Sequence, residues 1–253
     1  MHLNTNVSFK DKSILVIAPH PDDDVIGCGA CLFYLSKLSK NNKPSKVTIA
    51  YATNGVNGVS NNFLLQDKKY NLETISDDEK KKIKIKVREQ EARKACAFLD
   101  AQPVFLNLPF YQNKKKNIEL NDIEIVYKFI NLINPDVIFV IDEENDPHGT
   151  HGLVREVFLQ VLEEVYFDGL VFGYRVWGSG YKKEESAVIF EFDEDIMAQK
   201  ERLILCHESQ IKKPAFPHEK YDFVTMVKRS NNASAKNLQS EHLYIELYKR
   251  LRP

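Results

Sequence analysis

Residues 14–29 read ILVIAPHPDDDVIGCG, an unbroken apolar run followed at once by a histidine, a proline and three aspartates. The apolar run over 14–19 stops at a proline, and it predicts a strand that is buried on both faces. A helical pattern follows from about Val25 to Leu38. A buried strand that turns sharply into a helix opens a βα unit, so this stretch favours an α/β fold with a parallel sheet.

The rest of the chain repeats this alternation. Further strands are predicted at 46–53, 103–108 and 137–142, and helices at 83–99, 121–133 and from near His151 to about Tyr166. Two more strands at 169–178 and 186–192, interpreted as a hairpin-like pair, precede a helix at 194–205. Residues 56–82 are polar and are interpreted as a surface loop, while the part after 208 is left unassigned. The alternation indicates one α/β domain over 1–253, with a mostly parallel sheet and helices on both faces.

The charge balance gives no sign of a polyanionic partner. The 253 residues include 35 Lys and Arg against 36 Asp and Glu, a formal net charge of −1. Neither nucleic acid nor an anionic membrane is therefore expected as a partner. The N-terminal residues lack the features of a signal peptide, and no apolar run is long enough to span a bilayer, so we expect a cytoplasmic protein.

The four cysteines are expected to be reduced in that compartment. Cys28 and Cys31 have the CxxC spacing of a redox pair or of half a zinc site. No second cysteine pair exists to complete a four-cysteine site, so we interpret both as small buried residues on a helix.

Polar residues gather where the predicted strands end. His20 follows the first strand, Thr53-Asn54-Gly55 follows the second, residues 142–151 follow the fourth, and Trp177 ends the strand predicted at 169–178. In open α/β sheets the ligand site lies outside the carboxyl ends of the strands. These segments are therefore the expected place of the chemistry.

The corner after the first strand offers metal ligands. Around it His20 and Asp23 can face the same point, while Asp22 projects separately. A third ligand has to come from elsewhere, and His151 is the candidate. Two histidines and one carboxylate leave coordination positions open for water and substrate, as catalytic zinc sites require. Two plainer interpretations stay open: the aspartates cap the helix, or the histidines of His148-Gly149-Thr150-His151 are exposed at a helix start.

The combination of motifs resembles the LmbE-like, PIG-L-type de-N-acetylases over roughly residues 12–212, with residues 213–253 less certain. That family carries a P/A-H-P-D-D-E motif before a glycine-bearing helix, matched here by residues 19–29, and an H-P-D-H motif, matched by residues 148–151. Weaker similarities follow in the family's order: Thr53-Asn54-Gly55, Arg88-x-x-Glu91-Ala92, Tyr174-Arg175-Val176-Trp177, and Lys200 through His207-Glu208-Ser209-Gln210.

The resemblance implies a Rossmann-like zinc hydrolase that removes an N-acetyl group from an N-acetylglucosamine conjugate or a related N-acylated amino sugar. By motif, His20, Asp23 and His151 match the metal ligands. Asp22 matches the base that deprotonates the metal-bound water and then protonates the amine, and His148 matches the residue that stabilises the oxyanion. Amide hydrolysis needs such a nucleophile, proton shuttle and oxyanion partner. Another divalent metal such as Fe²⁺ suits the same ligands.

Two positions depart from the family pattern. Asp24 stands where the family usually has Glu, one methylene longer, so a contact behind the ligands is lost or shifted. Thr150 stands where the family has an Asp between the two histidines, which leaves the charge of His148 less supported. We hypothesise that acidic neighbours compensate, namely Asp142, Glu143, Glu144 and Asp146.

Three more residues are candidates for substrate binding, each with a plainer alternative. Arg88 could grip an anionic or hydroxylated group, or it is a solvated helix residue paired with a glutamate. Trp177 could stack on a sugar face, or it belongs to the core. His207 lies at the site edge or is a packed or capping histidine. Residues 56–82 and the part after 212 are expected to shape specificity.

Three other functions fit parts of the same sequence pattern. A non-haem Fe(II) oxygenase uses the same ligand set, but a largely β architecture would be expected for it. A non-catalytic module that binds a glycan or small ligand is suggested by Asp24 and Thr150. A dinucleotide site at Gly27-x-Gly29 lacks the third glycine, and the aspartates would repel a pyrophosphate. The expected partner is a small amino-sugar molecule, and the sequence leaves the oligomeric state open, homo-oligomers included.

Overall fold

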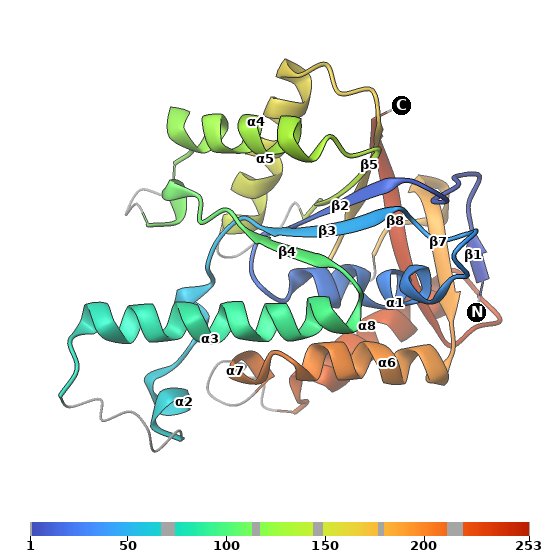
Figure 1. Cartoon of the computed structure of the whole chain (residues 1–253). Helices are drawn as coiled ribbons and strands as arrows, with labels where there is room; N and C mark the ends of the chain where they lie inside the picture. Colours follow the sequence, from blue (N-terminus) through green and yellow to red (C-terminus); the bar gives the residue numbers. More distant parts are fainter. Residues whose placement is uncertain are drawn as a thin grey trace.

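The computed structural model describes residues 2–66, 74–112, 117–143, 149–176, 180–211 and 220–252. Its eight strands form one sheet in the order β1-β7-β8-β6-β5-β2-β3-β4 (Figure 1). The five parallel strands are β2 (Ser13–Ala18), β3 (Lys46–Tyr51), β4 (Gln102–Phe105), β5 (Val137–Ile141) and β6 (Leu170–Tyr174). Three antiparallel strands complete one edge: β1 (His2–Asn4), β7 (Ser186–Phe192) and β8 (Tyr244–Arg252). The predicted α/β class is confirmed.

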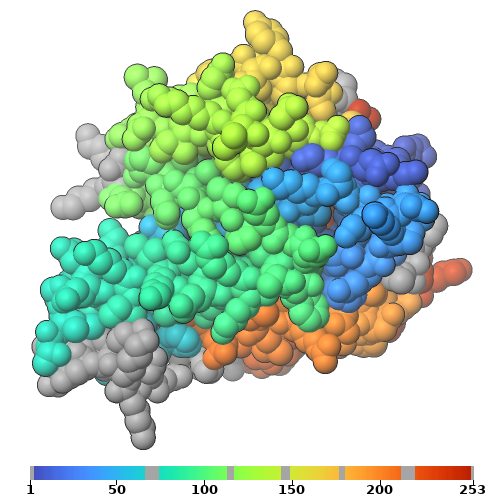
Figure 2. Space-filling model, viewed as in Figure 1, coloured from blue at the N-terminus to red at the C-terminus, as the bar shows by residue number. Residues whose placement is uncertain are grey.

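The centre of the sheet is apolar because helices cover both of its faces. All five residues of β5 are buried, as are Ile14–Ala18 of β2. One face carries α1 (Asp23–Lys37), α3 (Asp77–Phe98), α6 (Glu194–Leu205) and α8 (Phe223–Asn237), and the other carries α4 (Leu120–Ile133) and α5 (Thr150–Glu164) (Figure 1). Shorter helices are η1 (Val56–Gly58), α2 (Asn61–Gln66), η2 (Pro109–Gln112), η3 (Lys183–Glu185) and α7 (Glu208–Ile211). The N-terminal end of α3 reaches beyond the sheet (Figure 1), and its atoms project at the left of the space-filling view (Figure 2).

The prediction that 169–178 and 186–192 form a hairpin-like pair is wrong. β8 lies between β6 and β7 and pairs antiparallel with both of them. The inserted strand comes from the part of the chain that the sequence left unassigned. The strand predicted at 169–178 also ends earlier, at Tyr174.

The interpretation of residues 56–82 as a loop is also wrong in part. Helix α2 occupies Asn61–Gln66, and α3 begins at Asp77 rather than near 83. Ser76 and Glu79 form a reciprocal capping box at the start of α3. That pattern of a serine followed three residues later by a glutamate is a helix-start signal readable in the sequence.

The packing of α1 explains its glycines and cysteines. A Cβ on Gly27 would lie 2.3 Å from the ring of Tyr174, so only glycine lets α1 approach β6 this closely. All four cysteines are free, and Cys28 and Cys31 are buried on α1. Burial raises the pKa of both thiols, which suits the interpretation of the CxxC spacing as structural. Among the described residues, no helix has the length and apolarity needed to cross a bilayer.

Candidate metal centre and active site

The fold brings the two sequence motifs together at the point where the strand order reverses. The chain runs from β2 outward to β3 and β4, and it returns to β5 on the other side of β2. His20 lies just beyond the end of β2, and His151 lies in the first turn of the helix that follows β5. Parallel neighbours end at the same edge, so residues 131 positions apart meet in this crevice.

The nearest donor atoms of His20, Asp23 and His151 converge on one point. Nδ1 of His20 lies 3.1 Å from Oδ2 of Asp23, Nε2 of His151 lies 3.4 Å from the same oxygen, and the two ring nitrogens are 3.3 Å apart. Ligand atoms about 2.0–2.1 Å from a tetrahedral zinc ion lie about 3.3–3.4 Å from one another. The spacing of these three atoms therefore fits a single divalent ion, with one side left for water and substrate.

The chemistry of the donors supports the same fit. Nδ1 of His151 lies 2.8 Å from Oε2 of Glu143, and because a carboxylate only accepts, this nitrogen donates its hydrogen. With Nδ1–H donating to Glu143, Nε2 is the ring nitrogen that faces Asp23 and His20, as a metal-ligand histidine requires. The His151 and His20 imidazoles hold the pKa of Asp23 below its usual range although burial would raise it.

Asp22 stands apart from the three converging residues, as the sequence predicts. It occupies the N-cap position of α1 but makes no capping hydrogen bond with its side chain. Instead Nη2 of Arg88 donates to its Oδ1 at 2.9 Å. Burial raises the pKa of Asp22, and the charge of Arg88 opposes that rise. A partly desolvated carboxylate beside a metal-ligand set has the properties of a general base and acid.

Arg88 is neither solvated nor open to the crevice, because only 1% of its surface is exposed. Its neighbour one turn later, Glu91, lies 3.8 Å from Nη1 and accepts hydrogen bonds from the backbone and hydroxyl of Ser209 at 2.7 Å each. A Cβ on Gly55, whose φ is +60°, would lie 2.9 Å from Nε of Arg88. The Thr53-Asn54-Gly55 and Arg88-x-x-Glu91 similarities are thus parts of one buried support behind Asp22.

Asp24 is fully buried and lies away from the ligands. Tyr51 donates from its hydroxyl to Oδ2 of Asp24 at 3.2 Å, and the same hydroxyl lies 3.3 Å from the sulfur of Cys96. Burial raises the pKa of Asp24 to about 7. The residue that departs from the family motif therefore anchors α1 on β3 and α3.

Of the remaining residues that the sequence singles out, two are buried and two lie outside the described residues. His207 is fully buried near Arg88 and the backbone of Pro21, and burial together with the Arg88 charge lowers its pKa. Thr150 is buried as the first residue of α5. His148 and Trp177 lie outside the described residues. The sequence indicates Glu143 only as an acidic neighbour of His148, because its contact with His151 depends on the helical register of α5.

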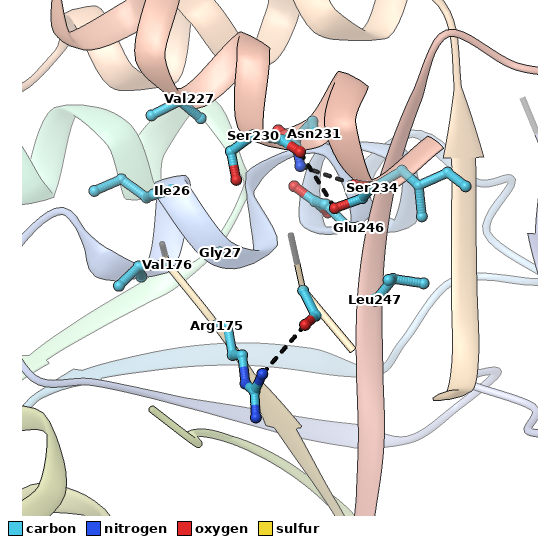
Figure 3. A pocket seen from close by; sticks show the side chains of 12 residues that line it. Ile26, Gly27, Arg175, Val176, Val227, Ser230, Asn231, Ser234, Glu246 and Leu247 are labelled. Carbon is cyan, nitrogen blue, oxygen red and sulfur yellow. Dashed lines mark hydrogen bonds between the residues drawn. The ribbon is translucent and has the colours of Figure 1, made fainter. Parts of the chain in front are cut away.

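A separate hollow lies between α1, β8 and α8 (Figure 3). It is lined by Ile26, Gly27, Arg175, Ser230, Asn231 and Glu246, among others. None of the three converging ligand residues lines it, and its volume of about 20 Å³ has room for a single water molecule. The hollow is too small to hold a sugar.

One family model matches the chain. Its description is "PIG-L: GlcNAc-PI de-N-acetylase", and it covers residues 15–162, more than half of the chain. The matched range includes the strand-to-helix corner at His20, Arg88 on α3 and the first turn of α5, which carries His151.

Similar proteins include one curated relative and several solved structures. A glucosamine-6-phosphate deaminase-like protein of Bacteroides thetaiotaomicron is 26% identical in an alignment that covers 81% of this chain but only 37% of the relative. The N,N'-diacetylchitobiose deacetylase of Pyrococcus horikoshii shares the fold with a TM-score of 0.71, 19% identity, and coverage of 95% of this chain and 84% of that one. The 4-carboxy-2-hydroxymuconate hydratase GalB of Pseudomonas putida has a TM-score of 0.64 at 13% identity, with 96% and 97% covered.

Proposed function

This chain belongs to the PIG-L family, and from that premise we propose that it is a metal-dependent N-deacetylase. Its substrate is an N-acetylglucosamine conjugate or a related N-acylated amino sugar. The observation that carries the proposal is the convergence of His20, Asp23 and His151 on one point, with Asp22 beside them but outside the ligand set. Fold likeness alone would not suffice, because the same fold serves a hydratase.

The three converging residues would hold the metal, which we propose to be zinc; Fe²⁺ also suits two histidines and a carboxylate. When bound, such an ion supplies an activated water at neutral pH and polarises the acetyl carbonyl. Asp23 offers the negative charge and the two imidazoles offer neutral nitrogen donors.

Asp22 moves the proton in the proposed reaction. Its carboxylate accepts a proton from the attacking water and donates it to the amine nitrogen as the C–N bond breaks. The opposing influences of burial and Arg88 on its pKa suit a group that has to perform both steps. Arg88 holds the carboxylate in place through the 2.9 Å contact.

The other proposed roles rest on the family resemblance. His148 is proposed as the residue that stabilises the oxyanion, and Trp177 as a surface for the sugar ring. Arg88 and His207, which the sequence offers as substrate-binding candidates, are proposed to support the site without touching the substrate. Their burial favours an indirect action, through the position of Asp22 and of the segment around Pro21.

The α/β architecture bears on the competing enzyme class. A non-haem Fe(II) oxygenase with this ligand set would have a largely β fold, whereas the five parallel strands here alternate with helices. The proposal of hydrolysis is the one that both the family and the placement of Asp22 support.

Acetate release from a panel of N-acetylglucosamine conjugates by zinc-loaded protein tests the proposal. We expect Asp22→Asn to lower kcat by about 10²–10⁴-fold, the usual contribution of a general acid–base group, while zinc stoichiometry stays at one. Asp195→Asn makes the same chemical change at an exposed position of α6 and should keep full activity. Full hydrolysis by Asp22→Asn, or no acetate from any substrate with zinc bound, would overturn the proposal.

A further inference from the structure

Two consecutive carboxylates at the end of β5 contact two consecutive turns of α5. Oδ1 of Asp142 accepts from Nε of Arg155 at 2.6 Å, and Oε2 of Glu143 accepts from Nδ1 of His151 at 2.8 Å. His151 and Arg155 are four residues apart and therefore lie one above the other on the same face of the helix. The metal-ligand turn of α5 is thus attached to the sheet at two points.

Asp142 is itself fixed by the neighbouring strand and the segment after it. Its backbone N–H donates to the carbonyl of Tyr174 at 2.8 Å, its Oδ2 accepts from the Tyr181 hydroxyl at 2.9 Å, and its carbonyl accepts from Nε of Arg175 at 3.2 Å. A Cβ on Gly173 would lie 2.6 Å from Cβ of Asp142 and 2.8 Å from the Tyr181 oxygen. Only glycine at this position leaves room for the arrangement.

Glu143 is almost fully buried, with 8% of its surface exposed. A buried carboxylate that accepts from Nδ1 of a histidine fixes the tautomer and the ring orientation, and it raises the basicity of the other nitrogen. In His151 that other nitrogen is Nε2, which faces His20 and Asp23.

We propose that Asp142 and Glu143 form a clamp that positions His151 as a metal ligand. The inference rests on the proposed function only in requiring a metal at the three converging residues. Glu143 sets the tautomer of His151. Asp142, through Arg155, sets the position of α5 relative to the end of β5 and its rotation about its own axis. The carboxylate support thus comes from the strand end, in a chain that has Thr150 rather than Asp between the two histidines.

Zinc affinity, measured by competition with a chromophoric chelator, tests the role of Glu143. We expect Glu143→Gln and Glu143→Leu to weaken zinc binding by about 10–100-fold, the usual effect of removing a partner behind a metal-ligand histidine. Glu156→Gln on the exposed side of α5 is the matched control and should bind zinc like the wild type. Nitrogen-15 NMR of His151 in the zinc-free variants should show loss of the Nδ1–H tautomer preference, a change that a general loss of stability would not produce.

A double-mutant cycle tests the role of Asp142. Asp142→Asn and Arg155→Gln should each weaken zinc binding by several-fold, and the double variant should lose no more than the worse single variant. Additive losses would show that the two residues act separately. Wild-type zinc affinity in both Glu143 variants would overturn the clamp.

The outcomes also separate the clamp from the proposed reaction. A wild-type protein that binds zinc but releases no acetate contradicts the proposed function, while the affinity series still decides the clamp. A wild-type protein that binds no divalent metal overturns both.

Discussion

The three aspartates after His20 occupy three different environments although they are consecutive. Asp22 pairs with Arg88, Asp23 converges with the two histidines, and Asp24 lies buried under Tyr51. They begin a helix, in which successive side chains point about 100° apart. One turn therefore places one carboxylate against Arg88, one against two histidines and one in the core, so capping alone does not account for the run.

His207 provides a prediction of pH dependence at the residue scale. Burial and the charge of Arg88 lower its pKa in the folded protein, so the folded state binds fewer protons than the unfolded state below pH 6.5. The free energy of unfolding should therefore fall as pH drops through the pKa of the unfolded histidine. At pH 5 this one ring can lower the free energy of unfolding by at most about 2 kcal/mol.

The measurement is urea unfolding at pH 8 and pH 5 for the wild type and for His207→Gln. The loss of stability between the two pH values should be smaller in the variant, by up to about 2 kcal/mol. His242→Gln is the control, because His242 pairs with Asp193 in a half-exposed position outside the site. An equal loss in wild type and His207→Gln would show that the ring is not held neutral.

At the scale of elements, a buried ion pair connects three parts of the fold. Lys200 of α6 donates to Glu246 of β8 at 2.7 Å, and neither side chain is more than 1% exposed. The same carboxylate accepts from the backbone of Ala30 and Cys31 in the middle of α1, and Asn231 of α8 accepts a second bond from the lysine. Figure 3 shows Glu246 and Asn231 facing one another next to α1. The helix that carries the aspartates is thereby joined to the C-terminal strand.

Removing the lysine should therefore be costly. We expect Lys200→Met to lower the free energy of unfolding by about 3–5 kcal/mol, because it leaves an uncompensated charge in the interior. Lys200→Met combined with Glu246→Gln should recover part of the loss. Lys228→Met removes a partly exposed ion pair with Glu194 and should cost at most about 1 kcal/mol. Equal effects of the two lysine substitutions in urea unfolding would contradict the argument.

The surroundings of each strand explain why some strands can be predicted from the sequence and one cannot. The strands β2 and β5 are continuous apolar runs that helices cover on both sides, so local composition identifies them. β8 carries Glu246 at a buried position, a pattern that becomes intelligible only with Lys200 and α1 beside it. β8 lies between β6 and β7 because it pairs with both over a long sequence separation, and no local signal in 169–192 indicates this pairing.

At the scale of the whole molecule, the site depends on the order of the strands. His20 and Asp23 are close in sequence, so their pairing follows from one turn of chain. His151 joins them only because β5 returns to the side of β2, an inference that strand-end placement and the family resemblance make from sequence. The support from Glu143 and Arg88 could not be derived that way, because it depends on how two helices are rotated against the sheet.

A metal held, as proposed, by residues that follow β2 and by a residue that follows β5 should stabilise the entire fold. Zinc that binds the native state and not the unfolded state adds about 1.4 kcal/mol to the free energy of unfolding for each tenfold rise in free zinc above the dissociation constant. The expected result is a steady rise in urea midpoint across a series of zinc buffers for the wild type. Chelation should return the protein to a common lower stability without a change in the denaturant slope.

Substitution of a proposed ligand and substitution of a histidine outside the site should have different effects on the zinc dependence of stability. His151→Ala removes the proposed ligand that only the fold brings to the site, so the stability of this variant should no longer depend on zinc. His242→Ala removes a histidine from the far pairing with Asp193 and should keep the full dependence on zinc. If His151→Ala responded to zinc as the wild type does, the stabilising ion would be bound elsewhere, and the link from strand order to metal site would fail.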